Sequence, residues 1–395
     1  MKRFFSYIIL SFFLLLLPTG QASANNNDSI RLSLLTCAPG EEIYSLFGHT
    51  AIRYENPSQG IDVVFNYGLF SFNTPNFIFR FSLGETDYQL GATDYERFAA
   101  EYAFFGRSVW QQTLNLTDEE KTELIRLLQE NYRPENRVYR YNFFYDNCAT
   151  RPRDKIEESI AGKVIYPAEP QDGSLTFRDI VHQYCKGHPW ARFGIDLCIG
   201  SEADQPITQR QMMFAPFYLM DAFDGAQIKG DSIQRPLITA NELVVDATPE
   251  PDESDWMPTP LQCSLLLFIL TAAATIYGIR RRTGLWGIDL VLFGMAGIVG
   301  CVLAFLALLS QHPAVSSNFL LLVFHPGQLL FLPYIVYCVR KGKKCWYLTL
   351  NLVVLTLFIV LFPVIPQRFD FAVVPLALVL LIRSASNLIV TSKKK

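Results

Sequence analysis

The pattern of apolar and polar positions divides the 395-residue chain into three parts. An apolar run at residues 4–17 follows Lys2 and Arg3, and the small residues of Ala22-Ser23-Ala24 come soon after it. This order of a basic start, an apolar stretch and a small-x-small sequence is typical of a signal peptide. We therefore expect residues 1–24 to be a signal peptide and the chain from residue 25 onward to be exported.

The C-terminal third is almost continuously apolar. A transmembrane helix needs about 20 apolar residues. Five segments meet that length, at residues 261–279, 286–308, 318–338, 346–364 and 371–390. They predict an all-α membrane domain of five helices over residues 261–392, which a proline-rich acidic linker at 246–260 joins to an exported domain at 25–245.

Charges in the connections between these segments predict the orientation of the membrane domain. Three arginines at 280–282, four basic residues at 340–344 and three lysines at 393–395 follow the first, third and fifth segments. The two remaining connections contain one basic residue, Arg368. Basic loops stay in the cytoplasm. This rule is satisfied if the N-terminal domain is exported, the number of spans is odd and the tail at 393–395 is cytoplasmic. The expected location is a bacterial inner membrane.

The exported part has mixed α and β patterns. A β-rich segment at 50–54, a turn at 55–60 and a second strand at 61–67 predict a hairpin. Thr117 and Glu120 form a capping-box pattern at the start of an amphipathic helix over 117–131. An aromatic strand is expected at 138–145, and a helix is expected to begin at Cys148.

The charge balance differs between the two parts. Residues 25–258 contain 20 basic and 35 acidic residues, and residues 259–395 contain 12 basic and 2 acidic residues. The exported part therefore has a net charge of −15 and the membrane part +10. An acidic surface argues against nucleic-acid binding, and the sequence gives no sign of a cofactor or a metal site.

Two short segments contain residues suited to nucleophilic catalysis. Cys148 lies at a predicted strand-to-helix junction, where the helix dipole is expected to lower its pKa. His49 opens a predicted strand and is the candidate general base. If the hairpin turn centres between residues 57 and 58, Asn66 lies opposite His49 on the neighbouring strand and is the favoured orienting residue, with Asp62 further from the histidine. From spacing alone, purely structural roles for His49 and Cys148 are favoured, because one cysteine and one histidine far apart in sequence are a weak signal.

The order of these segments resembles the circularly permuted papain-like families, which include lecithin:retinol acyltransferase-like proteins and relatives of NlpC/P60 hydrolases. In those families a histidine opens a strand and an Asn-Cys pair opens a helix, as His49 and Asn147-Cys148 do here. The resemblance implies an α+β exported domain with a permuted papain-like core. The chain departs from the pattern at Ala149-Thr150, where an acidic residue and a histidine are usual, and at Asn66 or Asp62, where a second histidine is common.

A second resemblance covers nearly the whole chain. It rests on the strings TCAPGEEIYSLFGHTAIRY (36–54), VFNYGLFSFNTPNFIFRFSLGETDYQLG (64–91), PENRVYRYNFFYDNCATRPRD (134–154) and QHPAVSSN (311–318). These strings are similar to the Lnb-type lipoprotein N-acyltransferases of Bacteroidota. That family implies cysteine-dependent transfer of a fatty acyl chain from a phospholipid, through a thioester, to the N-terminal amine of a diacylglyceryl lipoprotein. A membrane-tethered cysteine amidase or peptidase of the cell wall, and a non-enzymatic receptor or scaffold, are the alternatives.

Polar residues at the predicted membrane surface are candidates for substrate binding. His312 and Asn318 lie in or beside an external loop, and His325 lies within the third apolar segment, where ionisable groups are often functional. Cys185 and Cys198 lie in the exported part, where a disulfide between them is possible. The sequence does not decide between a disulfide and two free thiols, and it does not determine the oligomeric state.

Overall fold

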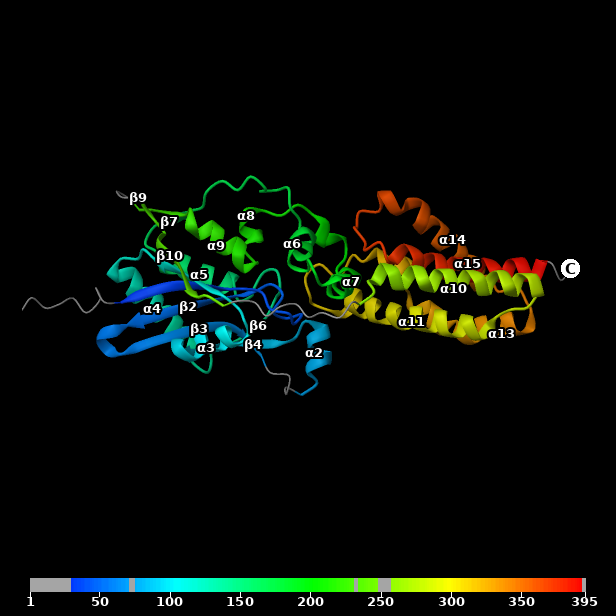
Figure 1. Cartoon of the computed structure of the whole chain (residues 1–395), viewed down its shortest axis with the longest axis horizontal. Helices are drawn as coiled ribbons and strands as arrows, with labels where there is room; N and C mark the ends of the chain where they lie inside the picture. The colour runs from blue at the N-terminus through cyan, green and yellow to red at the C-terminus, as the bar shows by residue number, and fades with distance from the viewer. Residues whose placement is uncertain (1–29, 71–74, 231–233, 248–256, 393–395) are drawn as a thin grey trace, which may run out of the picture.

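The computed structural model describes residues 30–70, 75–230, 234–247 and 257–392. The expected signal peptide and cytoplasmic tail lie outside these residues, as does most of the expected linker. Figure 1 shows the sheet and short helices at one end of an elongated molecule and the long C-terminal helices at the other. The prediction of a mixed α and β domain followed by a helical domain is confirmed.

A seven-stranded antiparallel sheet forms the centre of the N-terminal domain. In spatial order its strands are β10 (Ile238–Val245), β5 (Val109–Leu114), β1 (Arg31–Cys37), β2 (His49–Asn56), β3 (Ile61–Leu69), β4 (Asp87–Asp94) and β6 (Val138–Arg140). The predicted hairpin is β2 and β3, joined by the 3-10 turn η1 (Pro57–Gln59). The expected strand at 138–145 is shorter, because the chain leaves the sheet after Arg140.

Side chains alternate across this sheet and fill two apolar cores. Leu32 and Leu34 of β1 belong to a core that includes residues of α4, α5 and α9, whereas Leu35 packs on the opposite face with Phe98 of α3. The helices of this domain are α2 (Phe77–Leu83), α3 (Tyr95–Phe104), α4 (Asp118–Tyr132), α5 (Thr150–Ser159), α6 (Phe177–Tyr184), α7 (Pro189–Cys198), η2 (Ser201–Asp204), α8 (Gln209–Met212) and α9 (Pro216–Asp224). A small second sheet contains β7 (Lys163–Ile165), β8 (Gln227–Lys229) and β9 (Gln234–Pro236).

The start of α4 agrees with the capping-box prediction. The amide of Glu120 donates to the Thr117 hydroxyl at 3.3 Å, and the amide of Thr117 donates to the Glu120 carboxylate at 2.9 Å. These two bonds satisfy two backbone donors that have no partner within the helix.

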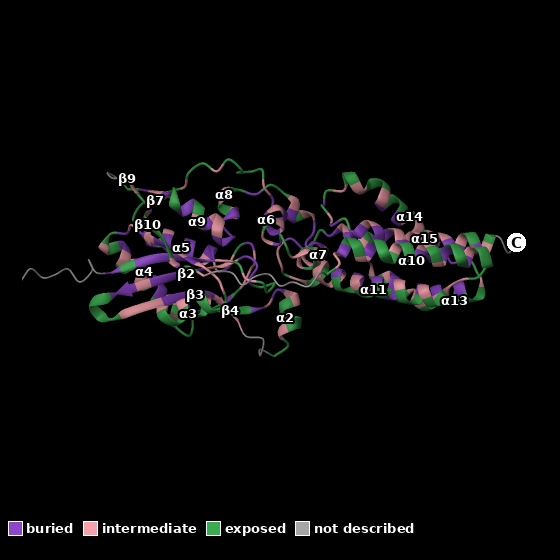
Figure 2. Cartoon of the chain, viewed as in Figure 1, coloured by how far each residue is buried: buried purple, intermediate pink, exposed green. Residues whose placement is uncertain are grey.

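The C-terminal domain is entirely helical in its described residues. Four helices are long and apolar enough to cross a membrane, and a bent pair would make a fifth span. The elements are α10 (Pro260–Arg281), α11 (Trp286–Leu309), η3 (Phe319–Leu322), α12 (Pro326–Leu330), α13 (Leu332–Lys341), α14 (Trp346–Leu361), η4 (Phe362–Val364) and α15 (Val373–Ser392). Figure 2 shows exposed residues along the outer sides of α10, α11 and α13, and the apolar side chains among them suit contact with lipid.

The third apolar segment was expected to form one continuous span over 318–338, but in the structure it is bent. Its two helical pieces meet at 74° near Phe331. Pro326 begins α12, and Pro333 lies in the first turn of α13. Proline lacks an amide donor and fits the first turn of a helix, so each proline favours a new helix start over continuation of the preceding one.

Polar contacts fasten the N-terminal domain to the ends of the membrane helices. Asn318 donates to the carbonyl of Leu197 at 2.7 Å. Arg368 forms ion pairs with Asp179 and Asp204 at 2.6 and 2.9 Å. The N-terminal domain is therefore held against one end of the membrane domain through α6, α7 and η2.

Candidate functional site

His49 is placed at the start of β2 by a glycine that no other residue can easily replace. Gly48 has a left-handed backbone with φ of +75°, and a Cβ there would lie 2.5 Å from the carbonyl oxygen of Cys37. A side chain at position 48 would therefore be strained both by its conformation and by a clash. The His49 ring contacts Asn66, with Nε2 at 3.2 Å from Oδ1.

The strand register explains why Asn66 is the partner of His49. Asn66 pairs directly with Ala51, which lies two residues after His49 and on the same face of β2. The histidine and the asparagine are therefore diagonal neighbours across the hairpin. Asp62, the alternative from the sequence, instead accepts two hydrogen bonds from Arg53 at 2.8 and 2.7 Å.

The contact with Asn66 also defines the protonation of the His49 ring. An amide oxygen only accepts hydrogen bonds, so Nε2 carries the proton and Nδ1 has a free lone pair. Burial lowers the pKa of His49 to about 4, while the hydrogen bond that His49 donates to Asn66 acts in the opposite direction. The ring is thus neutral at physiological pH, with Nδ1 able to accept a proton.

Cys148 lies in a tight turn that Asn147 organises. The Oδ1 atom of Asn147 accepts hydrogen bonds from the amides of Ala149 and Thr150 at 2.8 and 3.0 Å. Its Nδ2 atom donates to the carbonyls of Phe143 and Phe214. All four bonds fix the residue just before the cysteine. The expected helix start at Cys148 is wrong by two residues, because α5 begins at Thr150.

The thiol of Cys148 is directed at the end of β2. The pairing of β2 with β3 ends at Ala51 and Asn66, and the Thr50 amide beyond it hydrogen-bonds to the Cys148 sulfur. Burial nevertheless raises the pKa of Cys148 to about 11. The expectation of a lowered pKa is therefore wrong, because the loss of water around the thiolate outweighs the hydrogen bonds from Thr50 and from the cysteine's own amide.

Cys148 and His49 are both placed at the same end of β2, and both are neutral at physiological pH. In the described part of the chain no hydrogen bond joins the Cys148 thiol to the His49 ring, and the thiol contacts the amide of Thr50, the next residue after His49. Contacts between catalytic groups are often long before a substrate binds. A protonated thiol and an unprotonated Nδ1 are the forms needed for attack assisted by a general base.

A tyrosine hydroxyl without a partner lies beside this pair. A Cβ on Gly68 would lie 3.6 Å from the Cys148 Cβ and 4.0 Å from the Tyr139 hydroxyl oxygen, so both groups border the same small space. The hydroxyl is buried and has no hydrogen-bond partner among the described residues. Arg151 lies 3.5 Å from the centre of the Tyr139 ring and pairs with Asp146. The sequence analysis missed Tyr139, although its position in the aromatic string leading to Cys148 was a visible signal.

Two family models match the chain. The Lnb N-terminal periplasmic domain matches residues 20–182, and the Lnb transmembrane domain matches residues 252–395. The chain belongs to the Lnb family. It therefore has a periplasmic N-terminal domain and a membrane domain, and its family membership indicates a membrane enzyme that modifies lipoproteins.

The Lnb periplasmic match includes His49, Asn66 and Cys148. No curated protein matches the chain, and no solved structure matches it. The resemblance to papain-like enzymes and the catalytic roles of the three residues remain predictions.

The three residues expected to bind substrate in this Lnb protein lie apart from Cys148. The Nε2 atom of His312 lies 2.6 Å from the Phe81 carbonyl, next to α2. Asn318 is buried at the junction, where it contacts Leu197 and the amide of Leu320. His325 precedes α12 and packs closely on Gly300 of α11. The described contacts of these side chains connect parts of the protein to one another.

Cys185 and Cys198 are both free thiols. Among the described residues, no group of three or more histidine, cysteine, aspartate or glutamate residues is arranged to hold a metal ion.

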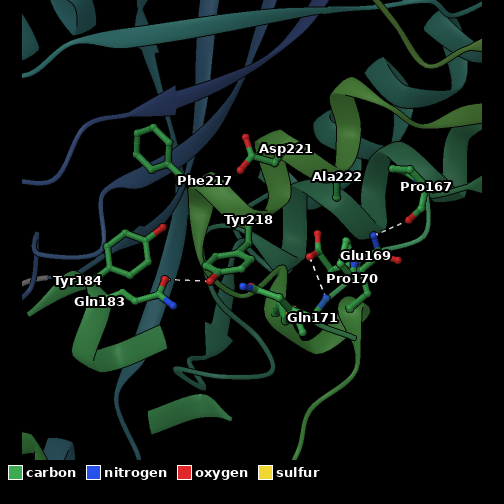
Figure 3. A pocket seen from close by; sticks show the side chains of 12 residues that line it. Pro167, Glu169, Pro170, Gln171, Gln183, Tyr184, Phe217, Tyr218, Asp221 and Ala222 are labelled. Atoms are coloured by element: carbon green, nitrogen blue, oxygen red, sulfur yellow. Dashed lines mark hydrogen bonds between the residues drawn. The ribbon is translucent and has the colours of Figure 1, made fainter. Parts of the chain in front are cut away.

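One open cavity among the described residues does not include the candidate catalytic residues. It has a volume of about 540 Å³ and lies among α6, α8, α9 and the loop at 167–171, with Tyr184, Phe217, Tyr218 and Asp221 in its wall (Figure 3). Tyr218 donates to Gln183 at its rim. Phe217 also borders the space beside Gly48, so this cavity lies behind the turn that holds His49.

Proposed function

We propose that this protein is a cysteine-dependent acyltransferase that moves a fatty acyl chain from a phospholipid to the N-terminal amine of diacylglyceryl lipoproteins. The observation that supports this most directly is the contact between His49 and Asn66 beside Cys148. It leaves one ring nitrogen free to take the thiol proton, in a domain attached to a membrane anchor.

In the first half-reaction the Cys148 sulfur attacks the ester carbonyl of the phospholipid. His49 Nδ1 takes the thiol proton as the sulfur–carbon bond forms, so a free thiolate is not needed in the buried site. The tetrahedral intermediate collapses by breaking the carbon–oxygen bond. The imidazolium gives its proton to the departing oxygen, and a lysophospholipid leaves while the acyl group stays on Cys148 as a thioester.

In the second half-reaction the neutral amine of the lipoprotein attacks the thioester carbonyl. His49 Nδ1 accepts a proton from the attacking nitrogen, and the carbon–sulfur bond breaks. The proton returns to the sulfur, which restores Cys148 and releases the amide product. Asn66 is a positioning residue in both steps, because it holds the ring with Nδ1 unprotonated.

The hydroxyl of Tyr139 is suited to stabilise the negative oxygen that forms in each half-reaction. It is a buried donor without a partner, and it borders the same space as Cys148. A donor fixed in place before the reaction stabilises a developing charge without the cost of reorganising solvent. The cation of Arg151 over the Tyr139 ring strengthens the hydroxyl as a donor.

The architecture brings both substrates close to the site. A phospholipid and a diacylglyceryl lipoprotein are both anchored in the bilayer, so an enzyme held at the same surface meets them at high effective concentration. In the proposed arrangement the periplasmic domain faces the outer leaflet of the inner membrane, and the basic loops and the C-terminus are cytoplasmic.

The proposal is tested by mass spectrometry of lipoprotein N-termini. Cells that lack the protein should carry lipoproteins with free N-terminal amines, and the wild-type chain should restore the N-acyl group. Cys148→Ala and His49→Ala should not restore it, although both should accumulate in the membrane. Cys198→Ala is the matched control for a lost thiol. Normal N-acylation in cells that carry only Cys148→Ala would refute the proposal, and cleavage of cell-wall peptides in its place would favour an amidase.

A further inference from the structure

The short helix α2 carries an apolar surface that faces outward. Ile78 is 81% exposed, Phe79 is 58% exposed and Phe81 is 44% exposed. Exposed aromatic and aliphatic side chains on neighbouring positions are unusual for a surface in contact with water. Figure 1 places α2 at the end of the N-terminal domain that adjoins the membrane helices.

Several contacts hold α2 at the level of the membrane. The ring centres of Phe79 and Phe305 are 5.9 Å apart, and Phe305 lies four residues before the end of α11. At 1.5 Å per residue that is about 6 Å along the helix from its end. The Gln311 amide donates to the Leu83 carbonyl at 2.8 Å. Gly84 allows this docking, because a Cβ there would lie 2.9 Å from the His312 backbone nitrogen.

A continuous series of aromatic rings leads from α2 into the N-terminal domain. The Phe81 and Phe77 rings are stacked at 6.0 Å, and Phe77 is stacked on Phe70 at 5.8 Å. Phe70 then contacts Tyr88 at 5.0 Å, and Tyr88 is stacked on Tyr141 at 4.2 Å. We call these five rings the aromatic track. All of its members except Tyr88 are at least partly exposed.

The inner end of the aromatic track lies next to the candidate nucleophile. Tyr88 of β4 pairs with Tyr139 of β6, and Tyr139 borders the space shared by Gly68 and Cys148. Phe70 follows Gly68 by two residues. The track therefore joins a surface at membrane level to the space beside the thiol.

We propose that the aromatic track binds one acyl chain of a membrane phospholipid and guides its ester carbonyl from the bilayer to Cys148. This inference deepens the proposed acyltransferase function and rests on it for the chemistry at Cys148. An acyl chain is the occupant that fits, because the track is aromatic along its length, begins with three phenylalanines and is continuous with the face of α2 packed on Phe305. Aromatic rings supply a large apolar contact area to such a chain.

Photo-crosslinking tests the binding site without requiring turnover. The full chain with Cys148→Ala is reconstituted in phosphatidylethanolamine and phosphatidylglycerol vesicles that contain a phosphatidylethanolamine with a diazirine on its acyl chain. Crosslinks are expected in peptides containing Phe70, Phe77 and Tyr141. The exposed Phe104 on α3 is the internal control and should stay unlabelled. Labelling confined to the membrane helices, or equal labelling of Phe104, would overturn the inference.

A comparison of esters with long and short acyl chains tests whether the aromatic track binds the acyl chain during the reaction. Phe77→Ser should reduce thioester formation from a long-chain phospholipid about tenfold, because a large apolar contact is lost. Release from a short-chain ester should change less than about twofold, because such an ester does not reach Phe77. Phe104→Ser should change neither rate. An equal loss with both esters would contradict the acyl-chain site. Crosslinking to the track in the Cys148→Ala chain, together with no thioester on the wild-type chain, would support the lipid site and refute the proposed acyl transfer.

Discussion

The Nε2 atom of His49 lies 3.2 Å from the Oδ1 atom of Asn66, across the β2–β3 hairpin. This contact orients the ring and assigns its proton to Nε2, so the nitrogen left for chemistry is Nδ1. Desolvation, and not this contact, keeps the half-buried histidine neutral and usable as a base, near a half-buried cysteine that is protonated.

Removing the Asn66 amide should slow acyl transfer without unfolding the protein. Asn66→Ala leaves the His49 ring free to rotate, and a base displaced by about 1 Å costs roughly a hundredfold in rate. Thioester formation measured in vesicles gives this rate. Asp62→Ala is the matched control on the same strand. It removes a partner of Arg53 and should lower thermal stability, while the rate stays within about twofold.

The pH dependence of thioester formation should follow the buried His49. Its pKa of about 4 lies below the ordinary value of 6.5 because burial disfavours the charged ring. The ring is therefore unprotonated above about pH 5, and the rate should fall only as the pH drops through about 4. Asn66 holds this pKa up, so Asn66→Ala should move the acid limb to lower pH. An acid limb near 6.5 in the wild-type protein would contradict the buried base.

Tyr139→Phe should separate catalysis from stability. Loss of one donor to a developing oxyanion costs about a hundredfold or more in kcat. The hydroxyl has no partner in the part of the chain that the structure describes, so its removal should leave the melting temperature unchanged or slightly higher. Single-turnover kinetics and thermal unfolding measure the two effects. A lower melting temperature with a normal rate would show a structural role for the hydroxyl.

Asn318→Ala should act on the junction between the domains. The side chain donates to the Leu197 carbonyl at 2.7 Å and accepts from the Leu320 amide at 3.0 Å. Loss of these buried bonds should cost about 1–3 kcal/mol. Thermal unfolding of the full chain in vesicles should show this loss, with KM for the lipoprotein changed less than about twofold. An increase in KM with unchanged stability would support the substrate-binding role expected from the sequence.

The sequence predicted the features that depend on local patterns. The apolar segments located the membrane helices, and Thr117 with Glu120 located the start of α4. Asn66 was also a correct choice of partner for His49, although the expected register placed the two directly opposite. In the structure the pairing of β2 with β3 is shifted by two residues. A shift of two residues leaves every side chain on its original face of the sheet, so Asn66 and His49 still share a face.

Other features depend on the tertiary environment, which the sequence pattern does not describe. The pKa of Cys148 is raised by burial, and burial at that turn arises from packing of distant segments around it. The position of Asn318 depends on its contact with Leu197 of α7. The aromatic track joins α2, the residue after β3, β4 and the segment after β6, and the last of these is distant from the others in sequence.

The most direct test of the account is capture of the acyl group on Cys148. The full chain is incubated in vesicles with a phospholipid that carries an isotopically labelled acyl chain, without a lipoprotein acceptor, and is then examined by intact-mass and peptide mass spectrometry. The account predicts one labelled acyl group on Cys148, removable by neutral hydroxylamine and absent in Cys148→Ala and His49→Ala. Labelling of a different residue, or N-acylation of an added lipoprotein by the Cys148→Ala protein, would contradict it.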